Sequence, residues 1–245
     1  MKKVWSLFMM GVFLSLFVIS PIQAEEASQI VEKMIEASGG RKLLESIQDT
    51  TLTGDMELTQ QGLSGTVTFY HKEPDKMRQD IEIMGMLITN ATDGEIVWAI
   101  NPQTGGVEEQ HEERGSYFKK VAFQFGNSII LHPEKYGVTY SSKGKEKIEN
   151  KEYLVIEQKF SDGYSTTMYV DSDTHLVYKT RQKSLGDFGN EIDQESIFED
   201  YREVDGIMMP HMMTIFRGGE EFGGFAVTEL KLNSGLEDSL FQMEK

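Results

Sequence analysis

The chain has 245 residues, contains no cysteine and carries a formal charge of −16 at neutral pH. The missing cysteines exclude disulfides, thiolate metal sites and a cysteine-linked lipid anchor. The negative charge argues against nucleic acid and anionic membrane surfaces as partners, because both repel an acidic protein. Any soluble exported protein could carry this charge, so it selects no function by itself.

The first residues have the order of a secretory signal peptide. A lysine pair precedes a nearly uncharged apolar stretch over residues 4–19, and the sequence reaches Ala24 before the acidic Glu25. A membrane-spanning helix is the alternative, but it needs about 20 apolar residues. We therefore expect residues 1–24 to be a signal peptide cleaved between Ala24 and Glu25. Residues 25–245 show no linker and no internal repeat, which predicts one domain, located in the periplasm or secreted where no outer membrane exists.

Three regions have the apolar spacing of helices. Residues 27–38 carry apolar side chains three and four positions apart, and Gly39 and Gly40 supply the left-handed conformation that ends a helix. A second, short helix is expected over residues 43–47. The stretch 114–131 places aromatic and aliphatic residues on one helical face, which predicts one or two helices in the middle of the chain.

The rest of the chain alternates apolar and polar residues with a period of two, which is typical of strands. The turns between them carry Gly, Asp, Asn and Pro. The expected strands cover residues 51–59, 66–70, 77–83, 86–92, 96–101, 138–142, 153–160, 165–170, 176–184, 195–204, 207–217 and 222–232.

These strands predict a mainly β protein with a few helices, built on a large, curved antiparallel sheet of about 11 strands. Most connections have about two to five residues, whereas a parallel crossover needs a dozen or more. Several strands are apolar on both faces, so helices or loops are expected to fill the concave side.

No motif in the sequence would support catalysis. The five histidines are scattered, and none stands in a His-x-x-x-His pattern. A Gly-x-Ser-x-Gly elbow is missing, and the Gly-Gly-Arg-Lys sequence at residues 39–42 lacks the rest of a phosphate loop. We therefore expect a binding protein rather than an enzyme, with no cofactor.

One local pattern could suit a soft metal. Residues 208–213 read Met-Met-Pro-His-Met-Met, a set of thioethers around one imidazole that would fit Cu(I). In a strand, successive side chains point to opposite faces, so Met209 and Met213 cannot easily join Met208 and Met212 around one ion. Filling a core or lining an adaptable apolar pocket is the plainer use of these methionines. We expect no metal site.

Residues 198–211, Phe-Glu-Asp-Tyr-Arg-Glu-Val-Asp-Gly-Ile-Met-Met-Pro-His, resemble the LolA-like outer-membrane lipoprotein-sorting proteins, which are periplasmic lipoprotein carriers. The resemblance continues at residues 37–40, 72–78, 93–102 and 233–241, and so spans almost the whole mature chain. It implies a half-open, curved antiparallel β-barrel with a helical lid over an apolar cavity. It also implies binding of acyl chains of lipoproteins or other lipids.

The resemblance further implies an inner-membrane donor complex and an outer-membrane acceptor as partners of a monomer. In the best-known carriers, an arginine beside a proline on an early strand closes the lid by bonding to helix carbonyls. The matching place here holds Glu73 before Pro74. A sensor or interaction module that uses the same cavity without transfer is the alternative function. The inward residues expected to line the cavity are Met56, Leu58, Phe69, Met77, Ile81, Trp98 and Phe225.

Overall fold

The computed structural model describes residues 21–186 and 190–243. Its helices are α1 (Pro21–Ala37), α2 (Arg41–Ser46), α3 (Glu112–Phe125) and α4 (Ser128–Leu131), with short 3₁₀ turns η1 (Pro133–Tyr136) and η2 (Asp238–Phe241). Its strands are β1 (Asp49–Leu58), β2 (Leu63–Lys72), β3 (Lys76–Ile83), β4 (Met86–Thr92), β5 (Val97–Ile100), β6 (Val107–Glu109), β7 (Val138–Ile148), β8 (Lys151–Phe160), β9 (Ser165–Asp171), β10 (Val177–Leu185), β11 (Glu191–Val204), β12 (Ile207–Arg217) and β13 (Glu220–Leu232).

All 13 strands form one antiparallel sheet in the order β6-β5-β4-β3-β2-β1-β13-β12-β11-β10-β9-β8-β7. The chain starts at the centre of the sheet with β1 and builds outward to the edge strand β6. Helices α3 and α4 then lead to the opposite edge, and β7 to β13 return to the centre, where β13 pairs with β1. Edge strands β6 and β7 are not paired with each other, so the described sheet is open rather than a closed barrel.

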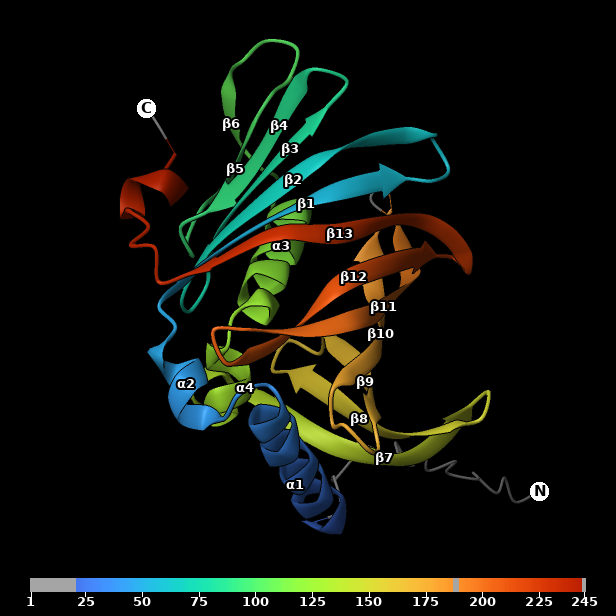
Figure 1. Cartoon of the computed structure of the whole chain (residues 1–245). Helices are drawn as coiled ribbons and strands as arrows, with labels where there is room; N and C mark the ends of the chain where they lie inside the picture. The colour runs from blue at the N-terminus through green and yellow to red at the C-terminus, as the bar shows by residue number, and fades with distance from the viewer. Residues whose placement is uncertain (1–20, 187–189, 244–245) are drawn as a thin grey trace, which may run out of the picture.

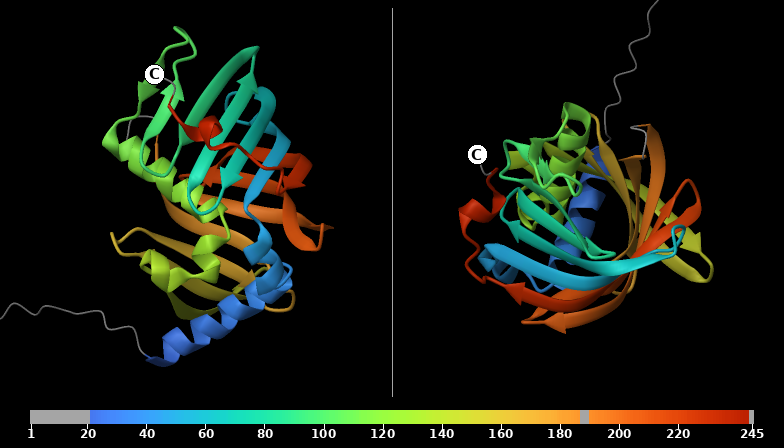
Figure 2. Two further views of the ribbon diagram at one scale, coloured as in Figure 1. Left: turned by 90° about the vertical axis from the view of Figure 1, so that its left-hand side faces the viewer. Right: turned by 90° about the horizontal axis from the view of Figure 1, so that it is seen from above.

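The sheet is strongly curved and the helices lie on its concave side or below it. Figure 1 shows α3 within the hollow of the sheet and α1 beneath β7. The left view of Figure 2 shows α3 running between the two halves of the sheet, and the right view shows the sheet curving around. The expected curved antiparallel sheet with a helical lid is therefore confirmed, with 13 strands instead of about 11.

The hydrophobic core between α1 and the β7 half of the sheet follows from the spacing of apolar residues in α1. Ile30, Val31, Met34 and Ile35 lie on one face of the helix and are at most 5% exposed. They pack with Ile156, Val170, Ile207 and other buried side chains of the sheet and of α2. This cluster fixes α1 against the β7 half of the sheet, away from α3.

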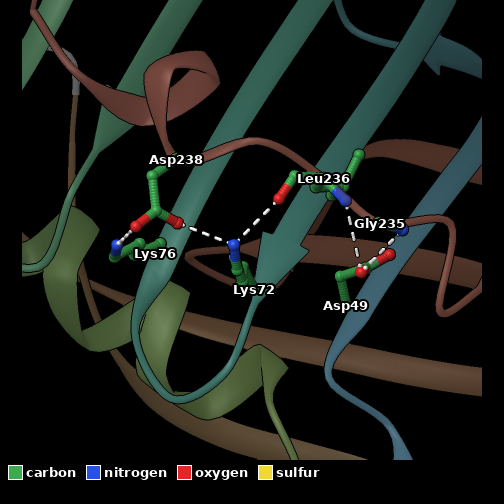
Figure 3. A network of polar contacts seen from close by, with 6 residues as sticks. All are labelled: Asp49, Lys72, Lys76, Gly235, Leu236 and Asp238. Atoms are coloured by element: carbon green, nitrogen blue, oxygen red, sulfur yellow. Dashed lines mark hydrogen bonds and ion pairs between the residues drawn. The ribbon is translucent and has the colours of Figure 1, made fainter.

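A C-terminal strap, residues 233–241, follows β13, and Figure 3 shows Gly235, Leu236 and Asp238 of the strap beside Asp49, Lys72 and Lys76. The Asp49 carboxylate accepts backbone hydrogen bonds from Ser234 at 2.7 Å, Gly235 at 3.0 Å and Leu236 at 3.3 Å. Burial raises the pKa of Asp49, but these donors and the Ser234 hydroxyl together hold the pKa below its ordinary value. Asp238 in turn binds both Lys72 at 2.7 Å and Lys76 at 2.9 Å.

Most of the predicted signal peptide falls on residues 1–20, which lie outside the described residues. Ala24 and Glu25, the predicted cleavage pair, belong to α1, which begins at Pro21 rather than at the expected residue 27. Within residues 21–186 and 190–243, no helix is long and apolar enough to cross a membrane.

Candidate ligand-binding site

An apolar strip runs along the concave face of the central strands. Strand pairing places Met56 of β1 beside Phe225 of β13, and Phe225 beside Met213 of β12. On the other side, Val67 of β2 lies beside Ile81 of β3. The Phe69 and Phe225 rings meet edge-on with centroids 5.7 Å apart. The apolar strip consists of Leu52, Met56, Val67, Phe69, Ile81, Met213 and Phe225, of which all but Leu52 and Val67 are only half-buried.

Helix α3 meets this strip at Phe69. The Phe125 ring lies 5.6 Å from the Phe69 ring, and near the start of α3 a Cβ on Gly115 would lie 3.6 Å from Val97 Cβ. Residues 117–121 and 123–125 are only half-buried, and the helix contacts strands on both sides of the hollow, β3 to β5 and β10. The helix therefore lies against the Phe69 end of the strip and joins the two halves of the curved sheet.

The structure brings together six of the seven residues predicted to line a cavity. Met56, Leu58, Phe69, Met77, Ile81 and Phe225 share the concave face by strand register, although Met77 is only 1% exposed. The remaining residue, Trp98, lies on the convex face. Its Nε1 donates to the backbone carbonyl of Phe241 at 2.8 Å, beneath the C-terminal strap. Strand β5 is only four residues long and apolar throughout, so alternation could not tell which face Trp98 takes.

The Glu73 latch joins the β2–β3 turn to the junction between α3 and α4. One carboxylate oxygen of Glu73 accepts from the backbone N–H of Asn127 at 2.6 Å, and the other accepts from Ser128 at 3.1 Å. A carboxylate at free N–H groups is favoured by charge as well as by hydrogen bonding. The residue that stands where the resemblance predicts an arginine thus contacts the lid through N–H groups instead of carbonyls.

His71 lies directly behind the latch. Its side chain is 1% exposed, its ring centroid lies 5.4 Å from that of Phe125, and its Nε2 finds no hydrogen-bond partner in the described part of the chain. Burial lowers the pKa of His71 below its ordinary value of 6.5, and the Glu73 carboxylate offsets only part of that effect. A Cβ on Gly126 would lie 2.6 Å from His71 Cε1, so the junction fits only glycine without rearrangement.

The fold of this chain is similar to that of several solved structures. An outer-membrane lipoprotein-sorting domain from Vibrio parahaemolyticus, described as putative, matches with a TM-score of 0.60 and 16% identity over 89% of this chain and 97% of that one. A LolA superfamily protein from Nitrosomonas europaea matches with a TM-score of 0.59 and 16% identity over 88% of this chain and 97% of that one. The fold is LolA-like. A DUF1329 family protein from Desulfovibrio piger shares it, with a TM-score of 0.60, 16% identity and coverage of 90% and 97%.

No protein-family model matches the sequence, and no curated protein matches it. At 16% identity the likeness to these structures is one of fold.

The strands of the other half of the sheet present one row of polar side chains to α3. Strand register aligns Tyr140, Gln158, Thr166 and Gln182 across β7 to β10 on the face that looks toward α3. Gln124 of α3 donates to Gln158 Oε1 at 2.9 Å and to the Thr166 hydroxyl at 2.8 Å. These five side chains form what we call the amide–hydroxyl row. Sequence reasoning missed the row, because its members lie on separate elements and only the register aligns them.

A second hollow, of about 360 Å³, lies along a different stripe of α3. Its lining mixes lysines and aspartates with aromatic rings, and Lys120 pairs with Asp162 at 2.7 Å. Burial raises the pKa of Asp75, another lining residue. This charged lining distinguishes the hollow from the apolar strip.

The methionine-rich stretch lies in β12 and divides between the two faces of the sheet. Met213 pairs with Phe225 on the concave face, whereas Met212 pairs with Ala226 and is 48% exposed. His211 Nδ1 lies 3.0 Å from the carbonyl oxygen of Met209. Among the described residues, no group of three or more His, Cys, Asp or Glu side chains is placed to hold a metal.

Proposed function

We propose that this chain is an exported, soluble carrier that binds acyl chains of lipoproteins or other lipids between its apolar strip and α3, and takes part in outer-membrane lipoprotein sorting. The observation that carries the proposal is the incompletely buried apolar strip on the concave face of the sheet, next to α3. A folded protein gains little by leaving large apolar side chains partly exposed on a concave face, unless a ligand covers them. The partners are an acylated lipoprotein or lipid, an inner-membrane donor and an outer-membrane acceptor.

The strip can supply enough binding energy for a reversible carrier. Burying one methylene group is worth about 0.8 kcal/mol. Eight methylenes of an acyl chain would therefore contribute roughly 6 kcal/mol before the cost of ordering the chain. That balance favours binding that a stronger acceptor can reverse.

The ligand must displace α3, and polar contacts hold that helix in place. At the C-terminal end of α3 these are the Glu73 latch and the two hydrogen bonds of Gln124. In the first half of α3, the Tyr117 hydroxyl lies 3.0 Å from the Ser184 hydroxyl. Polar contacts of this kind exchange readily with water or ligand groups, so the lid can move without unfolding the sheet.

The proposal is tested by titrating mature, delipidated protein with a fluorescent fatty acid. Phe69→Asp should abolish uptake, because it places an unpaired charge in the apolar strip. Glu57→Gln, on the opposite face of neighbouring β1, should leave uptake intact. Ile81→Asp provides a second test within the strip, and circular dichroism establishes that each variant is folded.

Folded wild-type protein that binds no acyl compound would overturn the carrier proposal. Mass spectrometry of the lipid that co-purifies with the mature protein would identify the natural ligand. Transfer of that lipid to an outer-membrane acceptor supports the carrier, whereas binding without transfer supports an envelope sensor with the same fold.

A further inference from the structure

The amide–hydroxyl row presents buried hydrogen-bond acceptors to the lid helix. With α3 in place, Gln158 is 2% exposed and Thr166 is 1% exposed, so both side chains take their partners from the protein rather than from bulk water. Both face Gln124, which is the residue of α3 that contacts them. The row thus forms a polar wall across the hollow from the apolar strip.

The direction of each hydrogen bond determines which atoms of the row are acceptors that face α3. Gln158 donates its amide N–H to the Tyr140 hydroxyl at 2.7 Å, which leaves Oε1 as the atom that faces α3. The Thr166 hydroxyl donates to Gln182 Oε1 at 3.2 Å, which leaves its lone pairs for α3. In the closed state the carboxamide N–H groups of Gln124 satisfy both acceptors.

Displacement of α3 removes Gln124 and leaves both acceptors to whatever takes its place, water or a group of the ligand. A buried acceptor that loses its partner is destabilising, whereas one that regains a donor from a ligand is not. A site built to accept a hydrogen bond discriminates strongly against an analogue that lacks the donor. The ligand that opens the lid is therefore favoured if it brings its own N–H group to Gln158 and Thr166.

We propose that Gln158 and Thr166 recognise an amide N–H next to the acyl chain, so that the site prefers amide-linked acyl chains to ester-linked ones. This inference rests on the proposed function, because it assumes that an acyl ligand replaces α3. The amide N–H takes the place of the Gln124 side chain, and the acyl chain lies on the apolar strip opposite.

Three probes of equal chain length separate the effect of the N–H donor from that of amide polarity. N-methyldodecanamide carries the donor, methyl dodecanoate replaces the N–H with oxygen, and N,N-dimethyldodecanamide keeps the amide without the donor. Each competes with the fluorescent fatty acid for wild-type protein. We expect N-methyldodecanamide to bind about tenfold more tightly than the other two, which is the equivalent of about 1.4 kcal/mol.

Matched variants assign the preference to named residues. Thr166→Val and Gln158→Leu each remove an acceptor and should reduce the preference toward equal binding of the three probes. Thr167→Val changes the neighbouring residue of β9, which faces the other side of the sheet, and should keep the full preference.

The possible outcomes separate this inference from the proposed function. Equal affinity of wild-type protein for all three probes overturns the inference while the acyl site stands. A tenfold preference that survives in both Thr166→Val and Gln158→Leu overturns the assignment to these residues. If no acyl compound binds wild-type protein, including the fluorescent fatty acid, the proposed function itself fails.

Discussion

Glu73 accepts a hydrogen bond from the backbone N–H of Asn127 at 2.6 Å, although the two residues are 54 positions apart in the sequence. This contact ties a turn of the first half-sheet to the junction where the lid helix ends. The C-terminal end of α3 in this LolA-like fold is therefore held by the turn between β2 and β3.

The Glu73 latch predicts that Glu73→Gln loosens the lid. The glutamine oxygen still accepts a hydrogen bond, but the charge that strengthens both contacts is lost, and a loss of about 1–2 kcal/mol is expected. Hydrogen exchange should accelerate at the Asn127 and Ser128 amides, and fatty-acid affinity should rise, because less free energy holds the lid closed. Glu82→Gln, on an exposed position of β3, is the control. Unchanged exchange at both amides would argue that the latch does not hold the lid.

The close packing around Gly126 predicts that Gly126→Ala disturbs the α3–α4 junction. The added methyl would lie 2.6 Å from His71 Cε1 and 2.8 Å from Glu73 Oε2, closer than side chains can approach. Overpacking of this kind usually lowers the free energy of unfolding by about 1–3 kcal/mol. Urea denaturation measures the loss. Gly106→Ala, whose methyl would have a nearest neighbour at 3.3 Å, should change stability much less.

The lowered pKa of buried His71 predicts that the free energy of unfolding depends on pH. Because its folded-state pKa lies below 6.5, the unfolded chain binds a proton that the folded chain does not as the pH falls. The free energy of unfolding should therefore decrease below about pH 6.5, by at most about 1.4 kcal/mol per pH unit for this one group. Urea titrations of wild type and His71→Gln at several pH values test this. Parallel pH profiles for the two proteins would contradict it.

The sequence was enough to predict the antiparallel sheet, the helices and most of the apolar strip, because period-two alternation is strong in β1 to β3. It underestimated β7, where Lys143 to Lys147 are all exposed and highly charged at the sheet edge. The short β6 was also missed, since three residues show no period. The partners of Glu73 and the amide–hydroxyl row depend on long-range register, which no local pattern contains.

The C-terminal strap provides a prediction separate from the lid. Asp49→Asn replaces a carboxylate that accepts several donors with a group that has one acceptor oxygen, and should lower the free energy of unfolding by about 1–3 kcal/mol. Because the strap ends on the Trp98 indole, loosening it should shift the fluorescence of this tryptophan. In protein without residues 1–24, Trp98 is the only tryptophan. Fatty-acid binding should be retained, since Asp49 does not line the strip.

A reversible lock on α3 tests the central claim that the ligand replaces the lid. The chain has no cysteine, and a Cβ on Gly115 would lie 3.6 Å from Val97 Cβ, within the range of a disulfide. The double variant Val97→Cys with Gly115→Cys can therefore join α3 to β5 under oxidation. Fluorescent fatty-acid binding is then measured on the same sample before and after reduction. We expect the oxidised protein to bind no fatty acid and the reduced protein to recover binding, whereas equal binding in both states would contradict displacement of α3.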